Sequence, residues 1–319
     1  MIELTAPGKQ SIVVETPVLF AAGAAGYDGA PYRKLLSLDK FGALVTPPLT
    51  PQARNPARGP RVVPLPSGFL LHTGLPNPGL SRAIKTYTES WRRSVLPIIV
   101  HFLADDYAAV EQMARLAERT PEIAGVELGL HDQASIHETR DMIDAVKQHT
   151  QLPLLVKLPL YGAVELTEVA QRNGADALVV AAPPRGTARD PMLGRLIGGR
   201  VYGPWLKAQS LRAVGQIVDY ADVPVIGCGG IHTPDDARDF ITAGARAVML
   251  DSVVWVNPRQ AEVIARNLGG AEITRTSGAL ADEWHPGMGD TIANMPPDPP
   301  ELPPSEEDAT QDGGVNPFR

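Results

Sequence analysis

The chain contains a single cysteine, Cys228, among its 319 residues. One thiol cannot form an intrachain disulfide, and it cannot supply the cysteine cluster of a structural zinc or iron–sulfur site. Positive charge is also in deficit, with 29 Lys and Arg against 36 Asp and Glu, which gives a net charge of −7. The sequence therefore predicts no metal centre and no electrostatic affinity for nucleic acid or an anionic membrane.

Long apolar runs are missing as well. No stretch approaches the ~20 apolar residues that a membrane-spanning helix needs. The N-terminal sequence MIELTAPGKQ also lacks the apolar segment of a signal peptide. We therefore expect a soluble cytoplasmic protein. A chain of this length suits one barrel of about 250 residues with extensions.

Eight short apolar runs are separated by segments with helical periodicity. Strands that alternate with helices predict parallel pairing, and eight such units favour an α/β fold of the closed (β/α)8 TIM-barrel type. A competing open dinucleotide-binding sheet would carry GxGxxG after its first strand, where this chain has none. The predicted strands cover 18–23, 43–47, 97–103, 125–130, 153–158, 177–182, 224–227 and 247–250. The predicted helices include 80–93, 106–119, 135–149, 163–173 and 206–220.

Three segments extend the barrel pattern. Ile12–Val14 is expected to form one strand of an N-terminal hairpin at the bottom of the barrel. Segments 47–79 and 183–204 are long and rich in Gly and Pro. Because loops of this length are usually functional, and loops after barrel strands carry the chemistry, we expect both to be mouth loops.

The C-terminal end differs in composition from the rest. We expect a barrel domain over 1–272 and a Pro-rich acidic tail over 273–319. From about residue 287 the tail has few large apolar side chains, so burial cannot offset its ordering entropy and the sequence predicts disorder there.

The segment 223–252 has the pattern strand, glycine loop, helix, strand. Gly229 and Gly230 allow a sharp turn close to a ligand, and Thr233 followed by Pro234 is typical of a helix start. In a (β/α)8 barrel the loops after strands seven and eight commonly bind phosphate through backbone N–H groups. A second interpretation is that the glycines only permit tight packing, and the motif alone leaves both open.

Several motifs occur in a definite order along the chain. They are PVLFAAGAAGYD (17–28), GLPNPG (74–79), VELGL (126–130), LVKLPL (155–160), GGRVYGP (198–204) and VIGCGGI (225–231). In order and spacing this set resembles the dihydroorotate dehydrogenase family, which are FMN-containing TIM barrels. The resemblance covers roughly residues 10–270. It implies an FMN-dependent oxidoreductase of the CH–CH type in pyrimidine metabolism, which acts on a small-molecule substrate, and a homodimer.

The resemblance also implies which residues hold FMN. Lys157 matches the lysine beside the flavin ring, where a cation stabilises the negative charge of the reduced flavin. Without the resemblance, a lysine at a strand end would read as a plain surface group. The other implied cofactor-binding residues are Ala22, Gly23, Thr46, Gly203, Gly229, Gly230 and Ser252.

Several positions depart from the family pattern. Pro47 and Pro48 replace a lysine and a serine, while Leu71, Gly129 and Ala182 or Pro183 replace asparagines that bind the pyrimidine acid in family members. Each lost hydrogen-bond partner costs about 1–3 kcal/mol, and a site built for polar groups discriminates strongly on them. We therefore expect dihydroorotate to be a poor substrate.

The predicted phosphate end changes too, because Asp251 precedes Ser252 where the family has glycine. A carboxylate about 4 Å from a phosphate charge costs ~4 kcal/mol at an effective dielectric of about 20. Unless Asp251 points away or pairs with Arg246 or Arg200, it weakens FMN binding.

Asp132 matches the family's catalytic Cys or Ser, and His131 lies beside it. These two are the predicted catalytic residues, since a carboxylate whose pKa is raised by burial accepts protons well. The alternative is that both are loop residues at the start of the helix near Ser135. Two other functions stay open: a non-catalytic or regulatory relative that has lost the flavin site, and a phosphate-binding barrel lyase or epimerase.

Overall fold

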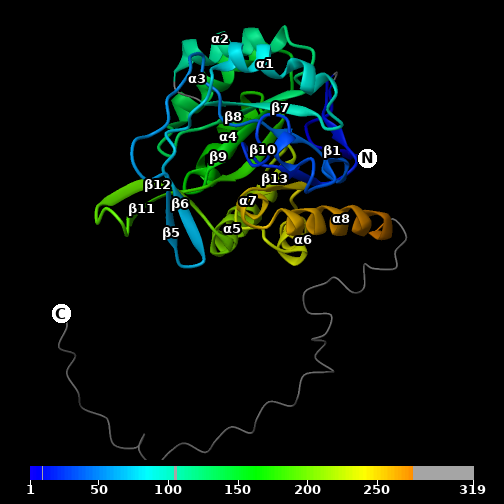
Figure 1. Ribbon diagram of the computed structural model, residues 1–319. Coiled ribbons are helices and arrows are strands. Elements are labelled where there is room, and N and C mark those ends of the chain that lie inside the picture. The colour runs from blue at the N-terminus through cyan, green and yellow to red at the C-terminus, as the bar shows by residue number, and fades with distance from the viewer. Residues whose placement is uncertain (9, 104–105, 276–319) are drawn as a thin grey trace, which may run out of the picture. The chain divides into compact units, whose positions relative to one another are not determined.

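The computed structural model describes residues 1–8, 10–103 and 106–275. Eight parallel strands close into a barrel in the order β10-β13-β14-β3-β4-β7-β8-β9 (Figure 1). Their bounds are β3 (Val18–Phe20), β4 (Leu44–Val45), β7 (Ile98–Leu103), β8 (Gly125–Gly129), β9 (Leu154–Pro159), β10 (Ala177–Ala182), β13 (Val225–Cys228) and β14 (Ala247–Leu250). Each coincides with a predicted apolar run, and the (β/α)8 barrel is confirmed.

The barrel strands are apolar along their whole length because both of their faces are buried. Every residue of β9, β13 and β14 is buried. Besides Cys228 on β13, three titratable side chains lie within the strands: His101 on β7, Glu127 on β8 and Lys157 on β9. Buried charges of this kind occur in proteins chiefly where they are paired or functional.

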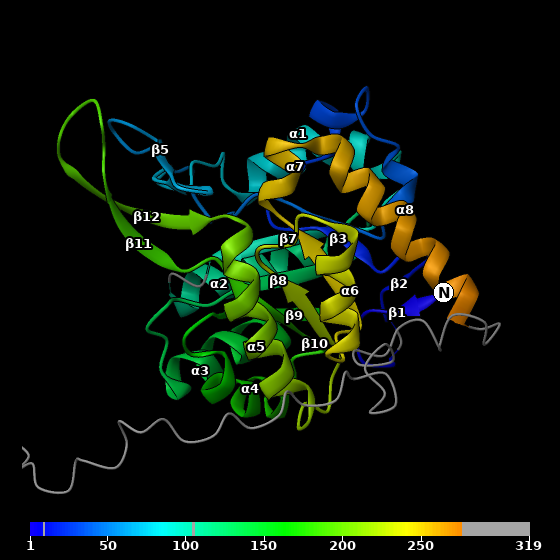
Figure 2. The same cartoon turned by 90° about the horizontal axis from the view of Figure 1, so that it is seen from below.

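Helices surround the barrel (Figures 1 and 2). Their bounds are α1 (Leu80–Arg92), α2 (Tyr107–Glu118), α3 (Ile136–Lys147), α4 (Ala163–Arg172), α5 (Lys207–Val218), α6 (Pro234–Thr242), α7 (Ser252–Val256) and α8 (Pro258–Arg275), with 3-10 turns η1 (Ala30–Tyr32), η2 (Leu38–Lys40) and η3 (Pro204–Leu206). Thr233 caps α6 as predicted, in a reciprocal capping box with Asp236. Ser135 and Glu138 form the same arrangement at α3.

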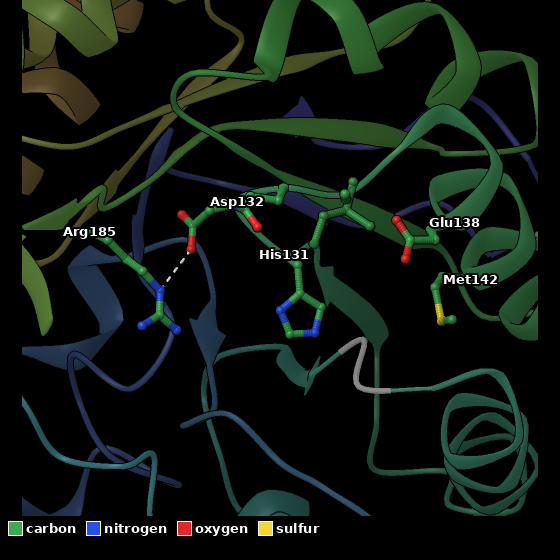
Figure 3. Close-up of a pocket in the computed structure, with 8 residues that line it drawn as sticks. His131, Asp132, Glu138, Met142 and Arg185 are labelled. Carbon is green, nitrogen blue, oxygen red and sulfur yellow. Dashed lines mark hydrogen bonds and ion pairs between the residues drawn. The ribbon is translucent and has the colours of Figure 1, made fainter. Parts of the chain in front are cut away.

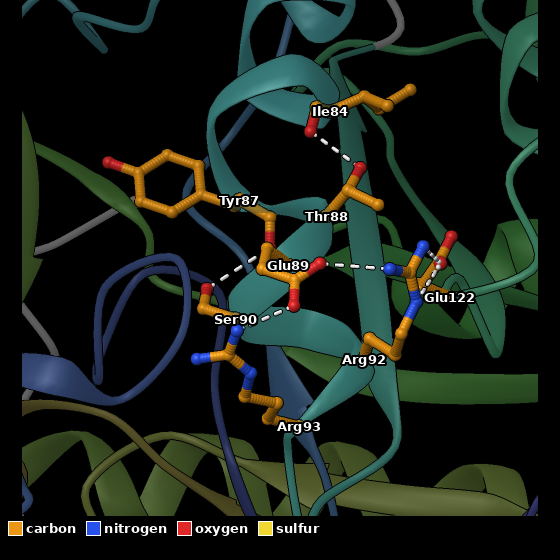
Figure 4. A network of polar contacts seen from close by, with 8 residues as sticks. All are labelled: Ile84, Tyr87, Thr88, Glu89, Ser90, Arg92, Arg93 and Glu122. Atoms are coloured by element: carbon orange, nitrogen blue, oxygen red, sulfur yellow. Dashed lines mark hydrogen bonds and ion pairs between the residues drawn. The ribbon is translucent and has the colours of Figure 1, made fainter.

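The end of α1 carries a network of exposed ion pairs (Figure 4). Arg92 lies 2.8 Å from Glu89 on its own helix and 2.7 Å from Glu122 on the connection between α2 and β8. Arg93 also reaches Glu89, at 2.6 Å. Exposed ion pairs contribute about 0–1 kcal/mol each to the free energy of unfolding. This network therefore adds little to the stability of the fold.

The predicted N-terminal hairpin is present. β1 (Ile2–Glu3) pairs antiparallel with β2 (Val13–Val14). Ala6 N–H donates to the Asp176 carbonyl just before β10, at 2.7 Å, and Ile12 packs against Gly125 at the start of β8. The hairpin therefore lies at the N-terminal end of the barrel strands, opposite the mouth.

The two long mouth segments contain strands that the sequence analysis did not predict. β5 (Val62–Leu65) and β6 (Gly68–Leu71) pair with β11 (Arg185–Arg189) and β12 (Leu196–Tyr202) in an antiparallel sheet of order β11-β12-β6-β5. The β11–β12 hairpin projects from the barrel in both views (Figures 1 and 2). A small core explains why these segments associate: Val63, Leu70, Ile197 and Val201.

Residues 1–272 form one compact unit. The predicted tail over 273–319, with its predicted disorder from about 287, lies almost wholly outside the described residues and stays a prediction. Within the part of the chain that the structure describes, no helix is both long enough and apolar enough to span a membrane.

Candidate functional site

The predicted cofactor residues lie where the barrel strands end. They are Ala22 and Gly23 after β3, Thr46 after β4, Lys157 on β9, Gly229 and Gly230 after β13, and Ser252 after β14. The Lys157 Nζ atom lies 3.8 Å from the sulfur of Cys228, the residue that directly precedes the glycine turn. Because the carboxyl ends of parallel barrel strands face one mouth, the lysine and the glycine turn belong to the same site.

The glycine turn is required by its own packing. Gly229 and Gly230 have φ values of 114° and 76°, which side chains rarely adopt. A Cβ at Gly230 would lie 2.2 Å from the Lys207 backbone nitrogen at the start of α5, and one at Gly229 would lie 2.5 Å from Ser210 Oγ. The tight-packing interpretation is thus sufficient for these glycines, and phosphate binding stays a prediction.

The packing argument predicts a large loss of stability for Gly230→Ala. The new methyl group would meet backbone atoms at an unfavourable φ, so we expect the free energy of unfolding to fall by about 2–4 kcal/mol. Gly215→Ala is the matched control, because Gly215 lies inside α5 with nothing within 4 Å of an added Cβ, and should gain about 1 kcal/mol. Urea denaturation followed by circular dichroism measures both, and equal midpoints would refute the argument.

The predicted phosphate end contains a buried carboxylate. Asp251 is 5% exposed, and its Oδ1 accepts hydrogen bonds from the Ser252 N–H and, at 2.9 Å, from Ser252 Oγ. His232 Nε2 lies 2.9 Å from the same hydroxyl. Burial lowers the pKa of His232 despite the nearby Asp251 and Asp236 carboxylates, so this imidazole is neutral at pH 7. The protein's own carboxylate therefore accepts a hydrogen bond from the N–H of Ser252, a residue that the resemblance assigns to FMN binding.

Lys157 is buried, at 4% exposure, so the alternative of a plain surface lysine is wrong. Its Nζ lies 3.9 Å from Glu127 Oε1. Burial disfavours the ammonium, but the Cys228 sulfur and the Glu127 and Asp251 carboxylates outweigh it and hold the pKa of Lys157 above its ordinary value. Burial likewise raises the pKa of Cys228 to about 12, so the thiol stays protonated and the site holds a fixed ammonium.

Glu127 links Lys157 to a histidine. The carboxylate is fully buried, and its Oε1 lies 2.6 Å from His101 Nδ1. Burial would raise the pKa of Glu127, but the Lys157 ammonium and the His101 hydrogen bond outweigh burial and hold it below its ordinary value. The second oxygen, Oε2, has no hydrogen-bond partner among the described residues. His101, Glu127 and Lys157 thus form a buried titratable row across β7, β8 and β9.

Aromatic side chains line the other side of the mouth region. Tyr202 at the end of β12 stacks on Phe69 with ring centroids 5.6 Å apart and meets the Trp255 edge at 5.1 Å. Burial and the nearby Asp251 carboxylate raise the pKa of Tyr202, so its hydroxyl stays protonated. Gly203 follows directly, and a Cβ there would lie 2.6 Å from the Ser67 carbonyl oxygen. Gly203 is therefore also accounted for by packing, between the two mouth hairpins.

The predicted catalytic residues Asp132 and His131 point in different directions (Figure 3). Asp132 is ion-paired with Arg185, at 3.1 Å, and with Arg200, which also donates to the Pro183 carbonyl at 2.8 Å. His131 and Asp132 nevertheless line the same cavity of about 650 Å³, together with Arg185 and with Glu138 and Met142 of α3. Asp132 therefore fastens the β8–α3 loop to the β11–β12 hairpin. These ion pairs argue against the role of a free base, which stays a prediction.

His101 is a candidate site residue that the sequence analysis did not single out. A Cβ at Gly129 would lie 2.5 Å from His101 Nε2. The imidazole therefore fills the space that a side chain at position 129 would need. A histidine and a glutamate inside two neighbouring apolar strand runs, PIIVHFL and GVELGL, were the available signal.

Comparison with known proteins decides the family. The family model described as dihydroorotate dehydrogenase matches residues 11–271. The chain belongs to the dihydroorotate dehydrogenase family. The family is one of FMN-dependent oxidoreductases, as the motifs predicted.

Individual relatives carry the same family name. A protein of Trichlorobacter lovleyi is 34% identical, covering 85% of this chain and 96% of its own length. Proteins of Geotalea uraniireducens and Geotalea daltonii are each 32% identical, covering 84% and 81% of this chain and 95% and 89% of their own lengths. All three are named dihydroorotate dehydrogenase B (NAD(+)), catalytic subunit.

The residues predicted to contact FMN suit the flavin ring better than they suit the phosphate group. At the ring end, a buried ammonium on Lys157 supplies the positive charge that a reduced flavin favours. At the predicted phosphate end, the Ser252 N–H donates to the carboxylate of Asp251. The residues can hold the cofactor, and we expect the phosphate end to bind it weakly.

Proposed function

We propose that this chain is an FMN-dependent oxidoreductase of the dihydroorotate dehydrogenase type whose pocket has diverged from dihydroorotate. The observation that carries the proposal is the buried Lys157 ammonium beside the Gly229–Gly230 turn at the mouth of a family barrel. A buried ammonium costs several kcal/mol unless it is paired. Glu127 compensates this charge in part, at 3.9 Å, and a reduced flavin, which develops negative charge beside the lysine, would be its second partner.

Named residues would hold the cofactor. Lys157 would lie at the flavin ring, and bound FMN would supply the oxidising power by accepting a hydride. The remaining contacts are proposed for Ala22, Gly23, Thr46, Gly203, Gly229, Gly230 and Ser252. The Thr46 hydroxyl accepts a hydrogen bond from the His101 N–H at 3.1 Å and donates to the Pro47 carbonyl at 3.1 Å, so the end of β4 is fixed before any ligand binds.

The positions that bind the substrate in family members are those at which this chain differs most from the family. Leu71 pairs with Arg200 as part of the mouth sheet, and Gly129 offers no side chain at all. Asp132, at the position of the family base, is committed to two arginines. Dihydroorotate would therefore leave several of its polar groups unpaired, and we propose that it reacts slowly.

The names of the relatives also support a proposal for the electron acceptor and for the assembly of this chain with other chains. Those proteins are named as NAD(+) enzymes and as catalytic subunits. A chain with one cysteine cannot ligate an iron–sulfur cluster alone, so we propose that electrons leave through a partner chain and that two copies of this chain form a cytoplasmic homodimer. Size-exclusion chromatography with light scattering would contradict the homodimer if it returned the mass of one chain.

An anaerobic absorbance experiment tests the proposed function. Protein incubated with FMN and desalted should show flavin bands, and excess dihydroorotate should bleach them over minutes to hours rather than seconds. Protein that stays colourless at high FMN would favour a non-catalytic relative that has lost the flavin site. Bleaching within seconds would refute the divergent pocket and leave the family assignment intact. A thermal shift with sugar phosphates but not FMN would favour the lyase or epimerase.

A further inference from the structure

The registers of three neighbouring strands bring a histidine to the mouth. His101 on β7 pairs with Glu127 on β8, and Gly129 on β8 pairs with Lys157 on β9. Gly129 is two residues closer to the mouth than Glu127 and faces the same side, because side chains alternate along a strand. The His101 ring rises from the Glu127 layer to the Gly129 layer, as the 2.5 Å approach of Nε2 to a Gly129 Cβ position shows.

His101 is held at two points, one on its backbone and one on its ring. Its backbone N–H donates to Thr46 Oγ1 at 3.1 Å, and its Nδ1 lies 2.6 Å from Glu127 Oε1. Since the Lys157 ammonium and the histidine keep Glu127 ionised, the carboxylate accepts and Nδ1 carries the proton. Nε2 is then the unprotonated nitrogen, and it has no hydrogen-bond partner among the described residues.

We propose that His101, oriented by Glu127, is the proton-accepting residue of this enzyme and takes the place of the Cys or Ser base of the family. This inference rests on the proposed function. Nε2 takes the proton from an acidic C–H of the substrate, and the electron pair of that C–H bond forms the new C=C bond. Bound FMN would supply the oxidising power by accepting the hydride of the adjacent carbon. The Glu127 carboxylate stabilises the imidazolium that results.

The surrounding charges favour His101 over the other candidates. Among the described residues, the titratable groups facing the row are Glu127 from β8 and Lys157 from β9, with Cys228 on β13 and Asp251 after β14 beyond the lysine. The adjoining end of β4 contributes only the Thr46 hydroxyl. Asp132 is paired with two arginines, whereas His101 keeps a lone pair at the level of the Lys157 ammonium.

Single-turnover reduction of FMN-loaded enzyme by dihydroorotate, used as the probe, tests the proposal across pH 5–9. Wild type should lose rate towards acid pH, as a reaction that depends on a general base does. His101→Gln should react about 10²–10⁴-fold more slowly and lose this acid limb, while binding FMN with unchanged affinity by fluorescence quenching. His137→Gln, an exposed histidine on α3, is the matched control and should match wild type.

The rival base is tested in the same series. Asp132→Asn should retain the acid limb, because it removes an ion-pair partner and not the proton acceptor. If Asp132→Asn abolishes the limb and His101→Gln retains it, the proposal is overturned.

Histidine ¹⁵N NMR of the cofactor-free wild-type protein separates this inference from the flavin assignment. The expected result is an Nδ1–H tautomer for His101 that Glu127→Gln disturbs. An Nε2–H tautomer would overturn the dyad even if FMN binds. An Nδ1–H tautomer in protein that takes up no flavin would instead support the dyad while the proposed function fails.

Discussion

Replacing Asp251 by glycine should tighten FMN binding by about 10²–10³-fold. The carboxylate sits at the N–H of Ser252, where the family resemblance places the phosphate. A carboxylate about 4 Å from a phosphate costs ~4 kcal/mol at an effective dielectric of about 20, and each 1.4 kcal/mol is about tenfold in affinity. Glycine removes the charge and leaves the N–H free for the ligand.

Quenching of FMN fluorescence on titration with protein measures this affinity directly. Asp251→Asn should give an intermediate gain, since the amide removes the charge but its oxygen still competes for the Ser252 N–H. Asp235→Asn is the matched control, a carboxylate in the first turn of α6 whose side chain is 82% exposed, and should change affinity less than twofold because water screens it. Unchanged or weaker binding by Asp251→Gly would show that the phosphate does not bind at this turn.

The cap at α7 adds a second readout to the same variant. The Asp251 side chain caps this short helix by accepting from Ser252, and loss of a cap typically costs about 1 kcal/mol of stability. Asp251→Gly should therefore be slightly less stable without ligand and clearly more stabilised by saturating FMN than wild type is.

The barrel could be predicted because each of its strands and helices is specified by a short stretch of neighbouring residues. Each strand is a short run buried on both faces, such as the apolar run before the Gly229–Gly230 turn, and each helix start has its own cap, such as Thr233. The mouth sheet could not be predicted in the same way. Its central pairing places Tyr202 opposite Phe69, and nothing in either segment specifies a partner more than 130 positions away in the sequence. Only the shared core around Leu70 and Val201 determines it.

The site, like the fold, could be predicted from the sequence only in part. Lys157 and the glycine turn follow from motif order, and the structure brings them together. The acid–base residues depend on side-chain partners that a sequence does not display. Asp132 matched a catalytic position, but the two arginines that pair with it come from β11 and β12. His101 could not be singled out from the sequence, because its partner Glu127 comes from the neighbouring strand.

Breaking the buried pair of Glu127 and Lys157 should destabilise the barrel more than any surface change. Glu127→Gln leaves the Lys157 ammonium without its 3.9 Å partner in a fully buried setting, and Lys157→Met leaves the carboxylate with one unsatisfied oxygen and no cation. Removing one member of a buried ion pair typically costs 3–5 kcal/mol. Each single variant should therefore lose about that much free energy of unfolding at pH 7, measured by urea denaturation.

The pH dependence and the double variant identify the cause. The pKa of Glu127 is lowered in the folded state, so its contribution is present above its unfolded pKa of about 4.5 and lost as pH falls below that value. The pKa of Lys157 is raised, so its contribution persists up to its unfolded pKa of about 10.5 and is lost as pH rises through the folded one. The loss of free energy of unfolding in Glu127→Gln should thus be constant over about pH 5–10 and shrink in acid.

The double variant Glu127→Gln/Lys157→Met should lose less free energy of unfolding than the sum of the two single variants, because no unpaired charge remains. Additive losses with no dependence on pH would mean that the two side chains act by packing alone, and that the ammonium at the mouth is not held by the glutamate.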